Sequence, residues 1–113
     1  MNSENGLDGY EYIYDNDSMY TYFIKSRASL RPSYKIATCA TDGKTIYYNP
    51  DWMSELSAQE QAFVILHNCA HIIMNHHANN FEENIALDRK VNRFLEDKFP
   101  EFIGMTVKLN GYI

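Results

Sequence analysis

Two histidines four positions apart are the residues of this sequence whose types and spacing could do chemistry. They are His67 and His71, in the stretch HNCAHIIMNHH. If this stretch is a helix, four residues correspond to about 40° of rotation and about 6 Å of rise, so both imidazoles face the same way. Two neutral imidazoles at this spacing can bind one Zn²⁺, and the alternative is a pair of stacked histidines in a protein core. The neighbouring residues are apolar, and two buried imidazoles without partners would be costly there.

Two further histidines follow in the same stretch, but both are poor candidates for a third ligand. On a continuous helix His76 would point about 180° away from His67, and His77 would lie about 15 Å further along the axis. We expect one of them to be a cap or an exposed side chain at the helix end, where the helix dipole favours a basic group.

A third ligand must therefore come from another element, and Asp88 is the best candidate. It lies among apolar residues in NIALDRKVN, where a carboxylate without a partner would be disfavoured. The alternative is that Asp88 forms a surface ion pair with Arg89 or Lys90, and the residues alone leave both interpretations open.

The helices that must position these side chains can be predicted from local signals. Ser57 and Glu60 have the spacing of a capping box, which predicts the start of a helix that runs to about His77. This helix is apolar nearly all round, which is typical of a helix buried in the centre of a domain. Residues 78–80 interrupt it, and a second helix is predicted over residues 82–97, before a proline.

A β-hairpin is predicted ahead of the first helix. Residues 34–39 and 45–48 are rich in β-branched and aromatic residues, and the Asp-Gly pair between them tolerates positive φ. Asn49 and Pro50 then have the cap and first-turn residue types that open a short helical turn.

Weaker patterns predict the structure of the two ends of the chain. Alternation with period two over residues 10–14 predicts a short strand, and residues 18–28 have a helical pattern with Ser18 as the N-cap. Pro32 would end that helix, and residues 106–109 are predicted to form one more strand.

Length and composition indicate one globular domain spanning residues 1–113, since the chain is 45% hydrophobic and 22% charged. The net charge of −5 argues against a sequence-independent grip on nucleic acid, so no nucleic-acid partner is expected. No signal peptide is visible and no stretch is long and apolar enough to span a membrane, so no membrane association is expected. The two cysteines give no disulfide framework, which makes a reducing cytoplasm the default compartment.

Charge is unevenly distributed along the chain. Residues 1–17 are acidic and tyrosine-rich, and four basic residues then lie close together: Lys25, Arg27, Arg31 and Lys35. The simpler interpretation is an acidic, partly solvated lead-in followed by a basic surface strip. The alternative is an acidic face for a basic partner.

Residues 38–93 resemble a known family, the metallopeptidase domain usually found before a von Willebrand-A-like domain in bacterial proteins. The resemblance rests on ATDGKTIYYNP, SAQEQAFVILHNCAHIIMNHH and NIALDRKVN, in the family's order and with compatible spacing. It implies a small zincin-like α+β fold, in which a β-hairpin packs on a central buried active-site helix and a second helix follows. It also implies roles for individual residues: His67 and His71 as Zn²⁺ ligands with Asp88 as the third, Tyr47 and Tyr48 beside the cleft, and His76 shaping the helix end.

Two departures from the family pattern bear on activity. The family's catalytic Glu, the general base of the HExxH motif, is replaced by Asn68, and no companion domain follows within the 113 residues. Asn has no carboxyl group to take a proton from zinc-bound water, and a positioned proton acceptor typically contributes about 10²–10⁴-fold to the rate. Rescue by another acid stays open, with Glu55, Glu82 and Glu83 as candidates.

Three functions therefore compete. The first is a zinc-binding metallopeptidase-like protein that is catalytically impaired by Asn68 and acts by binding a protein or peptide partner. The second is an active zinc-dependent peptide hydrolase with an atypical general base. The third is a metal-free interaction module that keeps only the fold, and the sequence leaves the oligomeric state open in all three.

Overall fold

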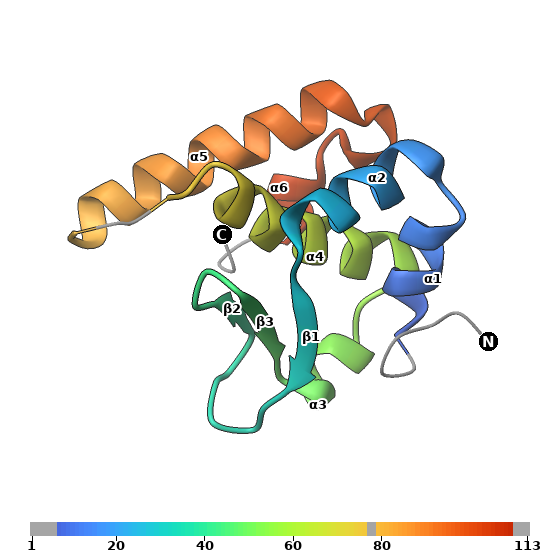
Figure 1. Ribbon diagram of the computed structural model, residues 1–113, viewed down its shortest axis with the longest axis horizontal. Helices are drawn as coiled ribbons and strands as arrows, with labels where there is room; N and C mark the ends of the chain where they lie inside the picture. Colours follow the sequence, from blue (N-terminus) through green and yellow to red (C-terminus); the bar gives the residue numbers. More distant parts are fainter. Residues whose placement is uncertain (1–6, 77–78, 110–113) are drawn as a thin grey trace.

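A three-stranded sheet lies at one end of a group of helices in the computed structural model, which describes residues 7–76 and 79–109 (Figure 1). The predicted α+β class is confirmed. Among the described residues, none of the helices combines the length and the apolarity needed to cross a bilayer. In chain order the elements are α1 (Asp8–Tyr14), α2 (Asp17–Ser26), β1 (Ser29–Pro32), β2 (Cys39–Thr41), β3 (Thr45–Tyr48), α3 (Pro50–Ser54), α4 (Ala58–Ile73), α5 (Phe81–Lys98), the 3₁₀ turn η2 (Pro100–Phe102) and α6 (Met105–Lys108).

The central element is α4, as the sequence predicted. The capping box is present: Glu60 N donates to Ser57 Oγ at 3.1 Å, and Ser57 N donates to Glu60 Oε1 at 2.7 Å. Every residue from Gln61 to Ala70 is buried, because α1, α2, α5 and the two strands of the hairpin all contact this helix. Such an enclosed helix holds its side chains in fixed positions, which is what a ligand site requires.

The predicted hairpin forms from β2 and β3 around Gly43, which has a φ of 99°. The turn is held by Asp42, whose Oδ1 accepts hydrogen bonds from Lys44 N at 2.9 Å and Thr45 N at 2.8 Å. The strand predicted from residue 34 begins only at Cys39, however, and residues 34–38 form turns and bends.

Side chains explain why this segment does not extend. Lys35 N donates to Ser33 Oγ at 3.2 Å, and Asn49 Nδ2 donates to Ile36 O at 2.9 Å. Such bonds offer the backbone an alternative to a strand ladder.

The sheet contains one strand that the sequence analysis missed. β1 pairs with β3 in parallel, which gives the order β1-β3-β2 and leaves β1 and β2 at the edges. The proline at the end of β1 is tolerated because an edge strand does not need every N–H. The central strand of the sheet is therefore β3. It pairs with β1 on one side and with β2, its hairpin partner, on the other.

The short helices and α5 follow their local signals. Asn49 Oδ1 accepts hydrogen bonds from Asp51 N at 2.9 Å and Trp52 N at 3.1 Å, which confirms the predicted cap of α3. The second long helix is confirmed as α5, and Asn80 caps it by accepting from Glu83 N at 2.9 Å.

The strand predicted at residues 10–14 is wrong, because this segment is the helix α1. Tyr10 and Ile13, three residues apart, are both buried, which places them on one helical face against α4. Gly9 allows the close approach: a Cβ at this position would clash with Gln61, and Gly9 N donates to Gln61 Oε1 at 2.7 Å. The described part of the acidic segment thus contributes to the core.

Two further predictions at the ends of the chain are wrong. The N-cap of α2 is Asn16, which accepts from Met19 N at 3.1 Å, rather than Ser18. The strand predicted at residues 106–109 is instead the helical turn α6, where Thr106 N donates to Glu96 Oε2 at 3.1 Å. Hydrogen bonds to α5 replace the strand pairing that this segment would have needed.

Candidate metal centre

Three potential ligand atoms from two helices converge on one point. His67 and His71 lie on α4, and Asp88 lies on α5, which packs against α4. Asp88 Oδ1 is 3.1 Å from His67 Nε2 and 2.9 Å from His71 Nε2, and the two Nε2 atoms are 3.1 Å apart. The three side chains are 3%, 14% and 19% exposed. No ion pair of Asp88 with Arg89 or Lys90 is present among the described residues.

This donor set fits a divalent metal ion. Zn²⁺ binds imidazole nitrogen and carboxylate oxygen at about 2.0–2.2 Å, so tetrahedral geometry puts the ligand atoms about 3.3–3.5 Å apart. The edges of the observed triangle, 2.9–3.1 Å, are only slightly shorter. Catalytic zinc sites typically have three protein ligands and leave a fourth position for water or substrate, whereas structural sites use four protein ligands. The three donors here match the catalytic pattern.

Electrostatics favour the protonation states that bind a metal. Burial lowers the pKa of His67, so the neutral imidazole is favoured. Burial alone would raise the pKa of Asp88, but hydrogen bonds from His67 and His71 outweigh it and hold this pKa well below its usual range. A neutral imidazole and an ionised carboxylate are the forms in which these groups coordinate a cation.

Asn92 is a site residue that the sequence analysis missed. It is buried on α5, and its Oδ1 lies 2.8 Å from His67 Nδ1. With a metal ion bound at the triangle, this oxygen would accept a hydrogen bond from Nδ1 of the neutral ring, and the lone pair on Nε2 would face the ion in place of the hydrogen bond to Asp88. The signal that could have found it is its spacing, since Asn92 lies four residues after Asp88 and so on the same face of α5.

α4 ends earlier than predicted, and this changes the place of His76. The last helical residue is Ile73, and Asn75 adopts the left-handed backbone conformation with a φ of 55°. The chain turns so that His76 Nδ1 lies 3.1 Å from His71 Nδ1. The expectation that His76 points away from the ligand pair is wrong, because it assumed a continuous helix. His77 lies outside the described residues.

Asn68, at the position of the general base, is bonded within the fold. It is 3% exposed, and its Nδ2 donates to Val64 O at 3.0 Å and to Cys39 Sγ at 3.3 Å. The side chain therefore ties α4 to β2. A carboxamide does not take up a proton near neutral pH, so this position supplies no general base.

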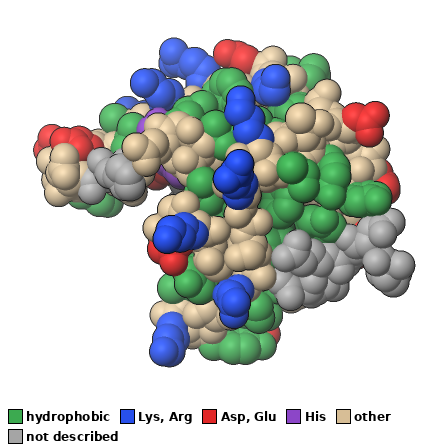
Figure 2. Space-filling view, viewed as in Figure 1, with side chains coloured by type: hydrophobic (Ala, Val, Ile, Leu, Met, Phe, Trp, Pro, Cys, Tyr) green, Lys and Arg blue, Asp and Glu red, His purple; other side chains and the backbone are tan. Residues whose placement is uncertain are grey.

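A cleft of about 670 Å³ opens over the three donors. It is lined by the hairpin from Thr38 to Lys44, by the C-terminal half of α4 with the turn after it, which includes His76, and by the first half of α5. Figure 2 shows histidine side chains in the recess beneath the projecting end of α5.

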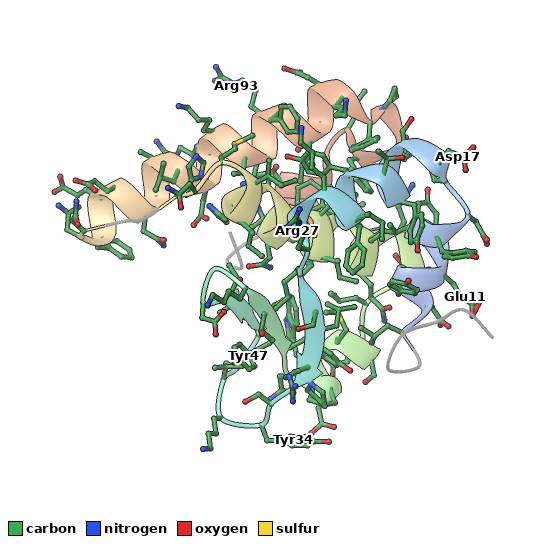
Figure 3. The ribbon with its side chains drawn as sticks, viewed as in Figure 1. Glu11, Asp17, Arg27, Tyr34, Tyr47 and Arg93 are labelled. Carbon is green, nitrogen blue, oxygen red and sulfur yellow. The ribbon has the colours of Figure 1, made fainter. Side chains whose placement is uncertain are left out.

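The two tyrosines expected beside the cleft are not among the described residues that line it. Tyr48 is buried in the hydrophobic core. Tyr47, labelled in Figure 3, donates from its hydroxyl to Asp42 Oδ2 at 3.2 Å. Both lie on the central strand β3, which pairs with β2, the edge strand that lines the cleft.

In this small α+β fold, two helical histidines and a carboxylate beneath a β-hairpin form a group that could hold a metal ion, an arrangement of the metallopeptidase type. The chain belongs to the family described as "Putative metallopeptidase domain", whose model matches residues 19–101. The match extends beyond the resemblance over residues 38–93 and runs from within α2 to just past α5. No curated protein and no solved structure matches the chain.

Proposed function

We propose that the protein binds Zn²⁺ through His67, His71 and Asp88 and uses the surrounding cleft to bind a protein or peptide partner without efficient hydrolysis. Zn²⁺ is the preferred ion because imidazole nitrogens with one carboxylate are among its usual ligand sets. When bound, it would polarise a carbonyl group and lower the pKa of a water molecule. The observation that carries the proposal is the use of the Asn68 amide to join α4 to β2.

No described acid that lines the cleft is suited to replace the missing base. Asp42 and Asp88 are the carboxylates among the described lining residues. Asp88 belongs to the ligand set. Hydrogen bonds from the backbone of Thr45 and Lys44 hold the pKa of Asp42 below its usual range, which makes it a weak proton acceptor.

The acids considered from the sequence do not support a rescue. Glu55, Glu82 and Glu83 are not among the described residues that line the cleft. The Glu83 carboxylate instead accepts a hydrogen bond from Asn79 N at 3.1 Å. An active hydrolase with an unusual base therefore has less support than a binding protein.

The edge of β2 favours a peptide as the partner. Backbone groups of an antiparallel strand point alternately toward the paired strand and away from it. Asn49 N donates to Thr38 O at 2.7 Å, so this carbonyl faces β3, and the backbone groups of Thr41 face the outer edge. An extended peptide can add to such an edge as another strand, and Thr41 lines the cleft.

Metal content and peptide binding test the proposal together. We expect about one Zn²⁺ per chain in protein purified without added metal, by elemental analysis. A peptide array should retain ligands for the zinc-loaded protein and lose them for His67→Ala, and mass spectrometry should find the peptides intact. Less than about half an equivalent of zinc, or cleavage that a chelator abolishes, would refute the proposal.

We also infer a reducing compartment, the cytoplasm, for this protein. Both cysteines, Cys39 and Cys69, are free and buried, and disulfides are rare in that compartment. Thiol labelling of protein unfolded directly from fractionated cells should find both cysteines reduced.

A further inference from the structure

We propose that His76 is a positioning residue that holds the ligand His71 in the tautomer and orientation that present Nε2 to the metal ion. The inference rests on the zinc site of the proposed function and deepens it, because it gives a role to a residue outside the ligand set.

The end of α4 places His76 through its backbone. Asn75 N donates to Ile72 O at 3.1 Å, and His76 N donates to His71 O at 2.9 Å. Together with the left-handed conformation of Asn75, these two bonds form a Schellman cap. Asn is one of the few residues besides Gly that adopt this conformation readily. The cap therefore fixes the point at which the His76 side chain leaves the backbone, next to the last ligand of the helix.

The contact between the two rings selects a tautomer. His71 Nδ1 and His76 Nδ1 are 3.1 Å apart, and between two neutral imidazoles one nitrogen must donate and the other accept. A bound metal ion would use the lone pair of His71 Nε2, so His71 would carry its proton on Nδ1 and donate a hydrogen bond to His76 Nδ1. The ring planes are inclined by 65° with centroids 5.2 Å apart, so the contact is edge-on and is not a parallel stack.

The other histidine ligand has the same arrangement. His67 Nδ1 lies 2.8 Å from Asn92 Oδ1, so both ligands direct Nδ1 to a partner in the protein and Nε2 to the donor triangle. The two partners lie on different elements, Asn92 on α5 and His76 after α4. Removing partners of this kind typically weakens metal binding by about 10–100-fold.

His76 does not act as a fourth ligand in this geometry. Its Nδ1 faces the Nδ1 of His71, whereas the other nitrogen of the His71 ring belongs to the donor triangle. The group of described residues whose ligand atoms lie within 4.8 Å of one another consists of His67, His71 and Asp88. His76 therefore acts through His71.

Zinc affinity of the full chain, measured by competition with a chromogenic chelator, tests this role. Asn places Oδ1 close to where His has Nδ1, so His76→Asn keeps an acceptor that His76→Leu removes. We expect Zn²⁺ binding to be about 10–100-fold weaker for His76→Leu and close to wild type for His76→Asn. The metal-free proteins should share one melting temperature, which separates positioning from a general loss of fold.

Two more measurements complete the test. Two-bond ¹⁵N–¹H correlations of the zinc-loaded wild type should show a proton on His71 Nδ1 and none on His76 Nδ1. Asn75→Gly keeps the left-handed conformation and should keep the affinity, whereas Asn75→Val disfavours it and should weaken Zn²⁺ binding.

Three results would overturn the inference while leaving the zinc site intact. The first is a Zn²⁺ affinity of His76→Leu equal to that of the wild type. The second is a loss of Zn²⁺ affinity in His76→Asn as large as the loss in His76→Leu. The third is a proton on His76 Nδ1 in the zinc-loaded protein. A wild-type protein that binds no zinc would instead refute the proposed metal site, and this inference with it.

Discussion

Asn68→Glu is expected to restore little hydrolysis by itself, because Cys39 Sγ lies against the side chain at this position and the substitution removes two hydrogen bonds. The amide it replaces is 3% exposed and donates two hydrogen bonds, each contributing about 0.5–1.5 kcal/mol to the free energy of unfolding. The substitution therefore removes about 1–3 kcal/mol and also buries a carboxylate. Glu is one methylene longer than Asn, and Cys39 Sγ lies only 3.3 Å from the present amide nitrogen.

Removing the Cys39 sulfur should allow the carboxyl group introduced by Asn68→Glu to act as a proton acceptor. In the double variant Cys39→Ala/Asn68→Glu, the side chain gains space beside β2 and can reach a molecule in the fourth position of the metal site. A positioned proton acceptor typically contributes about 10²–10⁴-fold, so kcat/KM for peptide hydrolysis should rise at least about 100-fold over the wild type. The assay is cleavage of an unstructured peptide mixture by zinc-loaded protein, followed by mass spectrometry.

Matched controls separate the explanations. Cys39→Ala alone should stay inactive, and His67→Ala added to the double variant should abolish any gained activity. A folded, zinc-loaded double variant that cleaves no faster than the wild type would refute the argument that the missing carboxyl group limits catalysis.

Three further predictions concern stability. At a zinc concentration 100 times Kd, binding adds about 2.7 kcal/mol, so the melting temperature should rise by about 10 °C or more, and His71→Ala should abolish the rise in scanning calorimetry. Gly9→Ala forces a Cβ into Gln61 and should lower the free energy of unfolding by about 1–3 kcal/mol in urea titrations. Burial lowers the pKa of His67 from 6.5 on folding, so as the pH falls His67 is protonated in the unfolded chain before it is protonated in the folded chain. The free energy of unfolding of the metal-free protein should therefore be greatest above about pH 6.5 and fall as the pH drops toward 5, measured by the same titrations.

Features of the fold that depend on adjacent residues could be predicted from the sequence. The capping box of Ser57 and Glu60, the Asp-Gly hairpin turn and the Asn49 cap all form as expected. Each of these signals is complete within a few residues, so it depends little on distant parts of the chain. The ligand pair on α4 was predictable for the same reason, because the helical period alone places the two histidines on one face.

Features that depend on distant contacts could not be predicted in this way. The alternation at residues 10–14 is also compatible with a helix that buries Tyr10 and Ile13, and packing against α4 selects the helix. β1 has little local pattern and exists because β3 offers it a pairing edge. Asp88 was a candidate among alternatives until the packing of α5 on α4 brought it to the histidines.

The substitution at the general-base position also has a structural consequence that the motif does not reveal. Asn68 lies one residue after His67, a proposed ligand, so its hydrogen bonds to Val64 and Cys39 fix the part of α4 from which His67 projects. The same bonds hold the edge strand β2 of the sheet against α4, the helix that carries the two histidines. A carboxylate at this position could not hydrogen-bond Val64 O or Cys39 Sγ, because it has no N–H to donate. It could instead turn toward the proposed metal site as a proton acceptor. The position can therefore supply either a proton acceptor or a link between β2 and α4, and in this protein it supplies the link.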